Sequence, residues 1–151
     1  MTQTPSPPIG RTAVVSKTLP VSSDCLAHLT RGLPPLQQIT LGKFRIAYRA
    51  NLTGRGDPLL FVHGLGSSHL VWARALPLLG RPYLAVDLPG YGESDKPRYG
   101  YTLPFYMRRL IRLLDALSIE RATWAGHSMG APIARLAPLA APARVPRRRP
   151  L

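Results

Sequence analysis

Acidic residues are scarce in this sequence. Only seven of 151 residues are Asp or Glu, against 20 Lys and Arg, and the formal net charge is +13 at pH 7. Such a basic chain suits nucleic acid or another anionic surface. Arginine dominates the basic residues, because Lys17, Lys43 and Lys96 are the three lysines. An arginine-rich composition also arises from GC-rich coding DNA, which we favour, with nucleic-acid binding kept as an alternative.

Cysteine is also scarce, and long apolar runs are missing. Cys25 is the one cysteine, so an intramolecular disulfide is excluded and nothing indicates an oxidising compartment. No apolar run approaches the ~20 residues that a membrane-spanning helix needs, and the N-terminus shows no apolar signal core. We therefore expect a cytoplasmic protein without a membrane span, and neither a metal site nor a cofactor.

The 17 prolines divide the chain into three parts. Residues 1–35 are rich in Pro, Ser and Thr, which indicates a disordered or loosely packed arm with a short helix around Asp24 to Thr30. Residues 36–137 carry the apolar patterns of a folded domain. Residues 138–151 contain four prolines and four arginines, which predicts a disordered tail.

Within 36–137, strand patterns alternate with helix patterns. Residues 38–41 and 44–49 predict an antiparallel hairpin around Gly42–Lys43. Residues 59–62 and 83–86 are apolar throughout, which is typical of parallel strands covered on both faces. The fold class is therefore α/β, with a mostly parallel sheet after a leading antiparallel hairpin.

Two helices are expected between these strands and the C-terminal part. One is capped by Ser67 or Ser68, includes residues 70–76 and ends at Pro77 and Gly80. The other follows the cap residue Thr102 and has one apolar stripe, formed by Leu103, Met107, Leu110, Leu114 and Leu117. Arg108, Arg109 and Arg112 lie away from the stripe, where we expect a solvated face.

Gly126-His127-Ser128-Met129-Gly130 is the most informative stretch. The Gly-x-Ser-x-Gly pattern follows a strand-like run and precedes a helix-like run, as in a nucleophile elbow. Such a turn exposes the serine hydroxyl to a base and brings backbone segments so close that Gly126 and Gly130 have to lack side chains. The alternative for the pattern alone is a glycine-rich turn without a catalytic role.

Two further motifs end the preceding strands. His63-Gly64 closes the first buried strand, and Asp87-x-Pro-Gly-x-Gly-x-Ser94 closes the second. Together with the elbow, these motifs resemble the α/β-hydrolase family over about 37–136. The resemblance implies that Ser128 is the nucleophile of an enzyme for small ester-like or related acyl substrates.

The resemblance also assigns roles around this serine. It implies that the backbone N–H groups of Met129 and Leu65 form the oxyanion hole, and that Gly64 belongs to the oxyanion loop. His63 is expected to be a structural loop residue, and His127 to point away from Ser128.

One departure from the family pattern concerns the rest of the triad. In this family the acid and then the histidine follow the serine, but no Asp, Glu or His follows Ser128, and the last ones are Glu120 and His127. We therefore expect a form truncated after the elbow helix and inactive. His69 is an alternative base that we considered and do not favour. The alternatives are a non-catalytic interaction module, self-associating or binding a partner through an open sheet edge, and a nucleic-acid-binding protein.

Overall fold

A computed structural model describes residues 23–146 of the chain. Within this range the elements are α1 (Ser23–Leu29), β1 (Gln37–Leu41), β2 (Phe44–Asn51), β3 (Leu59–Val62), the 3-10 helices η1 (His69–Trp72) and η2 (Leu76–Leu78), β4 (Tyr83–Val86), α2 (Leu103–Ala116), β5 (Thr123–Gly126), α3 (Gly130–Ala140) and the 3-10 helix η3 (Pro142–Arg144). One five-stranded sheet has the order β1-β2-β4-β3-β5. Strands β1, β2 and β4 pair antiparallel, whereas β3 pairs parallel with β4 and β5. The predicted α/β class with a leading hairpin is confirmed.

The hairpin turn is made by the residues that the sequence indicates. Leu41 pairs with Phe44, and Gly42 between them has φ 68°. A positive φ at the first central residue alone is the pattern of a type II′ turn, whose twist matches that of the strands. Glycine adopts this φ without the strain that a Cβ would add.

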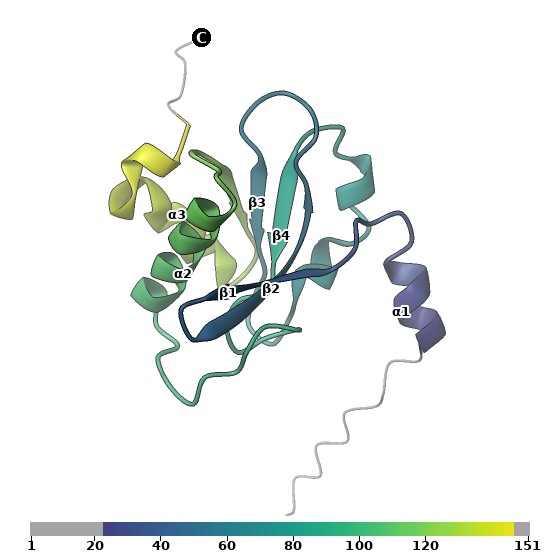
Figure 1. The fold of residues 1–151 in the computed structure, drawn as a ribbon, viewed down its shortest axis with the longest axis horizontal. Helices are drawn as coiled ribbons and strands as arrows, with labels where there is room; N and C mark the ends of the chain where they lie inside the picture. Colours follow the sequence, from purple (N-terminus) through teal and green to yellow (C-terminus); the bar gives the residue numbers. More distant parts are fainter. Residues whose placement is uncertain (1–22, 147–151) are drawn as a thin grey trace, which may run out of the picture.

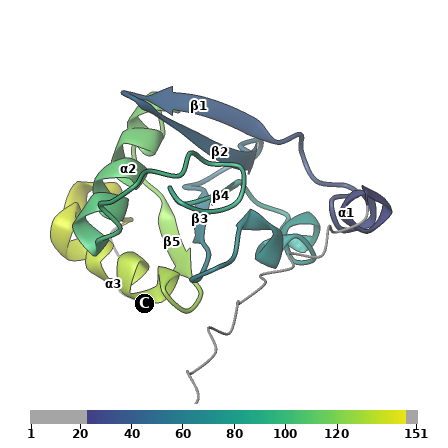
Figure 2. The ribbon, with the colours of Figure 1, turned by 90° about the horizontal axis from the view of Figure 1, so that it is seen from below.

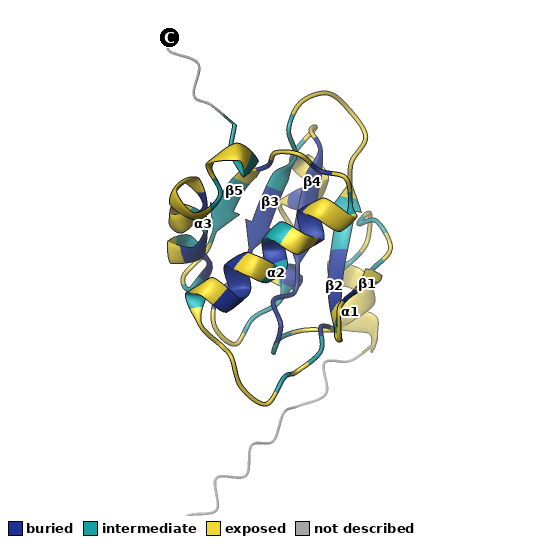
Figure 3. Cartoon of the chain, turned by 60° about the vertical axis from the view of Figure 1, so that its left-hand side comes forward, coloured by how far each residue is buried: buried dark blue, intermediate teal, exposed yellow. Residues whose placement is uncertain are grey.

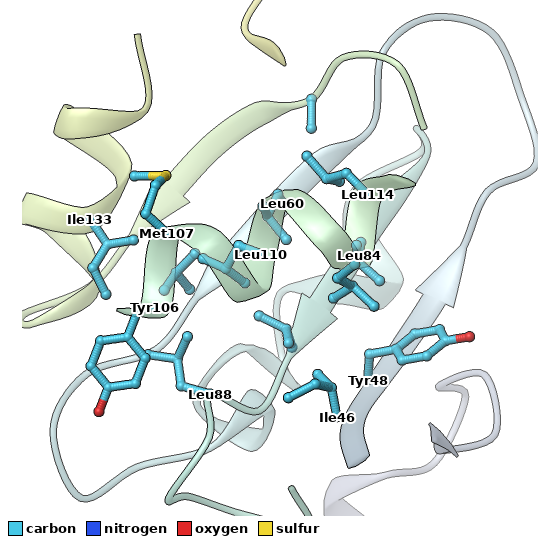
Figure 4. Packing of buried hydrophobic residues seen from close by; sticks show 14 of the residues in the cluster. Ile46, Tyr48, Leu60, Leu84, Leu88, Tyr106, Met107, Leu110, Leu114 and Ile133 are labelled. Atoms are coloured by element: carbon cyan, nitrogen blue, oxygen red, sulfur yellow. The ribbon is translucent and has the colours of Figure 1, made fainter. Parts of the chain in front are cut away.

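Helices cover the two faces of the sheet unequally. Figures 1 and 2 show α2 and α3 on one side, and α1 with the two short helices after β3 on the other. The larger apolar cluster lies under α2 and α3 and includes Leu60, Val62, Leu84 and Val86. Figure 4 shows Leu110 and Leu114 of α2 beside Leu60 and Leu84. Since side chains alternate along a strand, the remaining positions of β3 and β4 form a smaller cluster on the opposite face, Phe61, Tyr83 and Ala85, with Leu76.

Helix α2 confirms the predicted cap and most of the predicted stripe. The Thr102 hydroxyl accepts a hydrogen bond from the Phe105 N–H at 3.4 Å. Figure 3 shows a buried face of α2 toward the sheet and an exposed face toward solvent. The solvated face predicted for its arginines is wrong for Arg109, whose guanidinium lies 4.5 Å from the Phe44 ring centroid. Burial lowers the pKa of Arg109, and the nearby Arg112 and Arg108 lower it further.

The continuous helix predicted over residues 70–76 is absent. In its place the chain forms η1 and η2, with Ser68 capping η1 through a hydrogen bond from the Leu70 N–H. The physical reason is Pro77: in a continuous α-helix its ring would collide with the carbonyl of Ala73 and leave that carbonyl without a donor. The serine cap was predicted correctly.

The tail predicted to begin at 138 also differs from the structure. Helix α3 continues through Pro138 to Ala140, and η3 follows it. The Arg144 guanidinium donates to the carbonyls of Ile119 and Glu120 and forms an ion pair with Asp115. These contacts hold the segment against the domain although its sequence shows no periodicity.

The two ends of the chain lie outside the described residues. Most of the predicted arm, residues 1–22, is not described, and neither is 147–151 of the predicted tail. The helix expected around Asp24 to Thr30 is present as α1, which has no buried residue. Leu33 packs against the smaller apolar cluster.

Candidate active site

Ser128 lies on a sharp turn between β5 and α3. Its φ is 52°, a left-handed conformation that L-residues rarely adopt. Ser128 is exposed, and Met129 is the N-cap residue of α3. The turn therefore presents the serine side chain to solvent at the carboxyl end of the strand, beside the N-terminus of a helix.

Glycine is required on both sides of this turn by backbone contacts. A Cβ on Gly126 would lie 2.6 Å from the backbone nitrogen of Ala131, and one on Gly130 would lie 2.8 Å from the His63 carbonyl oxygen. Both distances are shorter than side-chain carbons tolerate, and backbone atoms cannot rotate away. The steric reason given for these glycines from the sequence agrees with the structure.

The loop after β3 lies directly against the turn. A Cβ on Gly64 would lie 2.8 Å from the Cβ of Ser128, so Gly64 allows the two segments to touch. The next residue, Leu65, is exposed. Within residues 23–146, the backbone N–H groups of Leu65 and Met129 form no hydrogen bond. Two free N–H groups therefore flank the segments that meet at Ser128.

His63 has a structural role, as expected. Its side chain is fully buried, its Nδ1 lies 2.7 Å from the Gly64 carbonyl oxygen, and its Nε2 accepts from the Leu88 N–H at 3.0 Å. This pattern requires the neutral ring with the proton on Nδ1. Burial lowers the pKa of His63, which keeps the ring neutral. His63 therefore links the loop after β3 to the loop after β4.

The side chain of His127, the residue before Ser128, lies beside Trp72. It is exposed, and its ring lies edge-on to Trp72 with the centroids 6.3 Å apart. Among the described residues it forms no hydrogen bond with Ser128.

His69 cannot replace the missing base. It is buried, and both of its ring nitrogens have partners: Nδ1 lies 2.9 Å from Asp87 Oδ1, and Nε2 accepts from Arg49 Nε at 3.0 Å. Neither nitrogen is directed to Ser128. The alternative base at His69, which the sequence did not favour, is therefore excluded because the ring belongs to a structural network.

Asp87 is the centre of this network. Its fully buried carboxylate accepts from the His69 N–H at 2.6 Å, from the His69 ring and from the Glu93 N–H at 2.9 Å. Burial acts to raise the pKa of Asp87, but these hydrogen bonds outweigh it and hold the pKa below its ordinary value. Sequence reasoning found Asp87 as part of a motif but missed Arg49, which donates to His69 in the same network, since residues far apart in the sequence give no common pattern.

Comparisons with known proteins agree with this geometry. The family model described as alpha/beta hydrolase fold matches residues 57–147, which is more than half of the chain. The chain belongs to the α/β-hydrolase family.

This α/β hydrolase aligns with only part of the length of individual relatives. An uncharacterized protein of Mycobacterium tuberculosis (strain ATCC 25618 / H37Rv) is 38% identical over 103 residues, which are 67% of this chain and 30% of the relative. The strigolactone esterase RMS3 of Pisum sativum is 32% identical over 103 residues, 64% of this chain and 39% of the relative.

A solved structure supports the same fold. It is described as a membrane phospholipase A and a novel bacterial virulence factor; it has a TM-score of 0.70 and 33% identity, covering 78% of this chain and 38% of that one. The chain thus spans about a third of the length of the proteins it matches.

Two further observations concern metal binding and membrane-spanning helices. Residues 23–146 of this α/β hydrolase contain no group of three or more His, Cys, Asp or Glu that could hold a metal ion. In the same described part, no helix is both long and apolar enough to cross a bilayer.

Proposed function

We propose that this chain carries the nucleophile and the oxyanion hole of a serine hydrolase that acts on small carboxylic esters or related acyl compounds. The observation that carries the proposal is the strained, exposed position of Ser128 at φ 52°. Strain of this kind persists at functional sites, where the surrounding structure holds it in place. A glycine-rich turn without a catalytic role has no need of a serine in this conformation.

The proposed reaction is acyl transfer. Ser128 Oγ attacks the carbonyl carbon, its proton passes to a base, the alcohol leaves, and water then hydrolyses the acyl-enzyme. The backbone N–H groups of Met129 and Leu65 would donate to the oxyanion, because neither forms a hydrogen bond within residues 23–146 and both lie next to the meeting point of Ser128 and Gly64. The names of two related proteins, an esterase and a phospholipase, support ester chemistry.

We further propose that the 151 residues do not turn over substrate by themselves. No Asp, Glu or His follows Ser128, and the buried His63 and His69 are engaged elsewhere. Loss of triad members lowers turnover by about 10⁴ to 10⁶ in serine proteases. The acid and the histidine of an active enzyme would have to come from residues outside these 151.

Hydrolysis of p-nitrophenyl acetate tests the proposed lack of turnover. The purified chain should hydrolyse it barely above the buffer rate, Ser128→Ala should leave that rate unchanged, and a fluorophosphonate probe should label Ser128 weakly or not at all. Rapid stoichiometric labelling, or turnover abolished by Ser128→Ala, would show that a base is present among these residues.

A second candidate function, a non-catalytic interaction module, is favoured by the sheet edge. β5 pairs with β3 on one side and is the last strand of the described sheet. The N–H groups of Thr123 and His127 bond to β3-side carbonyls, so by alternation those of Trp124 and Gly126 face the open edge. An open edge of this kind pairs readily with another strand.

Light scattering tests this candidate. We expect the chain to self-associate at tens of micromolar, and Thr123→Lys to reduce the association because an edge lysine opposes strand pairing. Thr123→Val is the matched control, which keeps the shape and should not reduce it. A stable, monodisperse monomer of the unmodified chain would contradict the module.

A further inference from the structure

A hollow in the surface lies far from Ser128. Its volume is about 560 Å³. Its walls come from the segment before β1, the end of β2 and the turn that leads into β4, with Leu33, Asn51, Leu76, Arg81 and Tyr83 among the lining residues. Since β3, β4 and β5 run parallel, Tyr83 at the start of β4 and Ser128 beyond the end of β5 lie at opposite ends of the sheet. Four strand residues separate the two ends by more than about 10 Å.

The floor of the hollow carries an unpaired hydroxyl. The Tyr83 side chain lines the hollow although the residue is only 3% exposed. Within residues 23–146 its hydroxyl forms no hydrogen bond, and it is not among the fully buried polar atoms that lack a partner, so it remains accessible to a ligand. Burial raises the pKa of Tyr83, with the Arg49 guanidinium opposing part of the rise, so the hydroxyl remains a donor at neutral pH.

The other polar groups of the hollow are also donors. Asn51 Oδ1 already accepts from the N–H and the hydroxyl of Thr53, which leaves the Asn51 amide NH₂ available. Arg81 uses one nitrogen to donate to the Asp57 carbonyl and keeps further N–H groups. Among residues 23–146, no Asp or Glu lines the hollow. The site is therefore positive and rich in donors, which suits an anion.

The remaining wall is apolar. Leu76 is almost fully buried and belongs, with Tyr83, to the smaller apolar cluster, against which Leu33 packs. Pro34 and Pro77 continue this wall. A ligand here meets hydrogen-bond donors on one side and hydrocarbon on the other, as in small-molecule sites generally.

We propose that this hollow binds a small organic carboxylate, with its oxygens at the Tyr83 hydroxyl and the Arg81 guanidinium and its apolar body against Leu33 and Leu76. The site is independent of Ser128 and of the proposed acyl chemistry. A bidentate guanidinium and a neutral phenol together favour a planar carboxylate over a spherical ion.

Titration with benzoate, followed by amide NMR of the full chain, tests the proposal. We expect saturable shifts at millimolar benzoate, concentrated on the amides of Leu33, Thr53 and Gly80. Tyr83→Phe keeps the packing and removes one charge-assisted hydrogen bond, so it should weaken binding about ten-fold or more. Arg81→Gln should weaken it about five-fold, and Arg98→Gln, which removes an exposed charge elsewhere, should not change it.

Three results would overturn the proposal. One is equal benzoate affinity in Tyr83→Phe, since any binding would then come from Arg81 alone. Another is equal affinity for benzamide, the neutral analogue of the same shape, because the site would then not select an anion. Shifts centred on Gly64 and Met129, and lost in Ser128→Ala, would place benzoate at the serine and have the same consequence.

Discussion

Replacement of Asp87 by asparagine should lower the free energy of unfolding by about 1.5–3 kcal/mol, which is the contribution of one hydrogen bond to a charged group. Asparagine can keep its oxygen toward the two His69 donors, but its NH₂ group then faces the Glu93 N–H, which donates to Asp87 Oδ2 at 2.9 Å. Two donors meet there, so that hydrogen bond is lost. Asp87→Ala removes all three hydrogen bonds and leaves their donors unsatisfied, at about 1–3 kcal/mol each.

The same carboxylate determines how the free energy of unfolding changes at acidic pH, which we call the acid limb. The pKa of Asp87 is lowered in the folded chain, so its contribution is fully present above the unfolded-state value of about 4. It is lost as the pH falls from there through the folded pKa. The unmodified chain should therefore lose stability below about pH 4, and Asp87→Asn should show a shallower decline in that range.

Urea denaturation followed by tryptophan fluorescence measures both effects. Asp95→Asn is the control, because Asp95 is a partly exposed carboxylate paired with Arg45, and its replacement should cost less than that of Asp87. If Asp87→Asn matches the unmodified chain in stability at neutral pH, or has the same acid limb, the carboxylate does not organise the two loops as described.

Two other substitutions test the elbow and the C-terminal segment. Gly126→Ala should destabilise the chain by about 3 kcal/mol or more through contact with backbone atoms, whereas Gly66→Ala, at φ 67° with no atom within 4 Å, should cost only about 1 kcal/mol; equal costs in urea denaturation would refute the steric reason. Arg144→Gln should lower stability by about 1–2 kcal/mol because it loses its hydrogen bonds to the Ile119 and Glu120 carbonyls, and the exposed Arg98→Gln should stay within about 0.5 kcal/mol. Identical midpoints for these two arginine variants would mean that the segment after α3 contributes nothing.

The elbow was predictable from sequence because its constraints are local. A side chain at Gly126 would clash with backbone only a few residues from Ser128, and one at Gly130 would clash with the end of the neighbouring parallel strand β3. The family motif includes both glycines. The hairpin at Gly42 and the cap at Thr102 are equally local, since a turn dihedral and an N-cap hydrogen bond involve neighbours in the chain.

Other features required contacts between distant residues. The helical pattern predicts that Arg109 is solvated at the surface, but the hairpin places the Phe44 ring beneath its guanidinium. The sequence shows no partner for His69, but Arg49 and Asp87 form hydrogen bonds with its two ring nitrogens. In both cases one partner, Phe44 or Arg49, lies on β2 far away in the sequence, so the contact depends on how the elements pack around the sheet.

The sequence alone therefore determined the strand and turn pattern, the family motifs, the candidate nucleophile and the lack of any acid or histidine after it. The tertiary structure decided which polar groups remain free. In the described part of the chain, the amides of Leu65 and Met129 and the Tyr83 hydroxyl form no hydrogen bond, while Arg144 is docked in a segment whose composition predicts disorder. The physical reason is that hydrogen-bond satisfaction depends on what lies across space, and a donor that the sequence shows as available is available only if no distant acceptor reaches it.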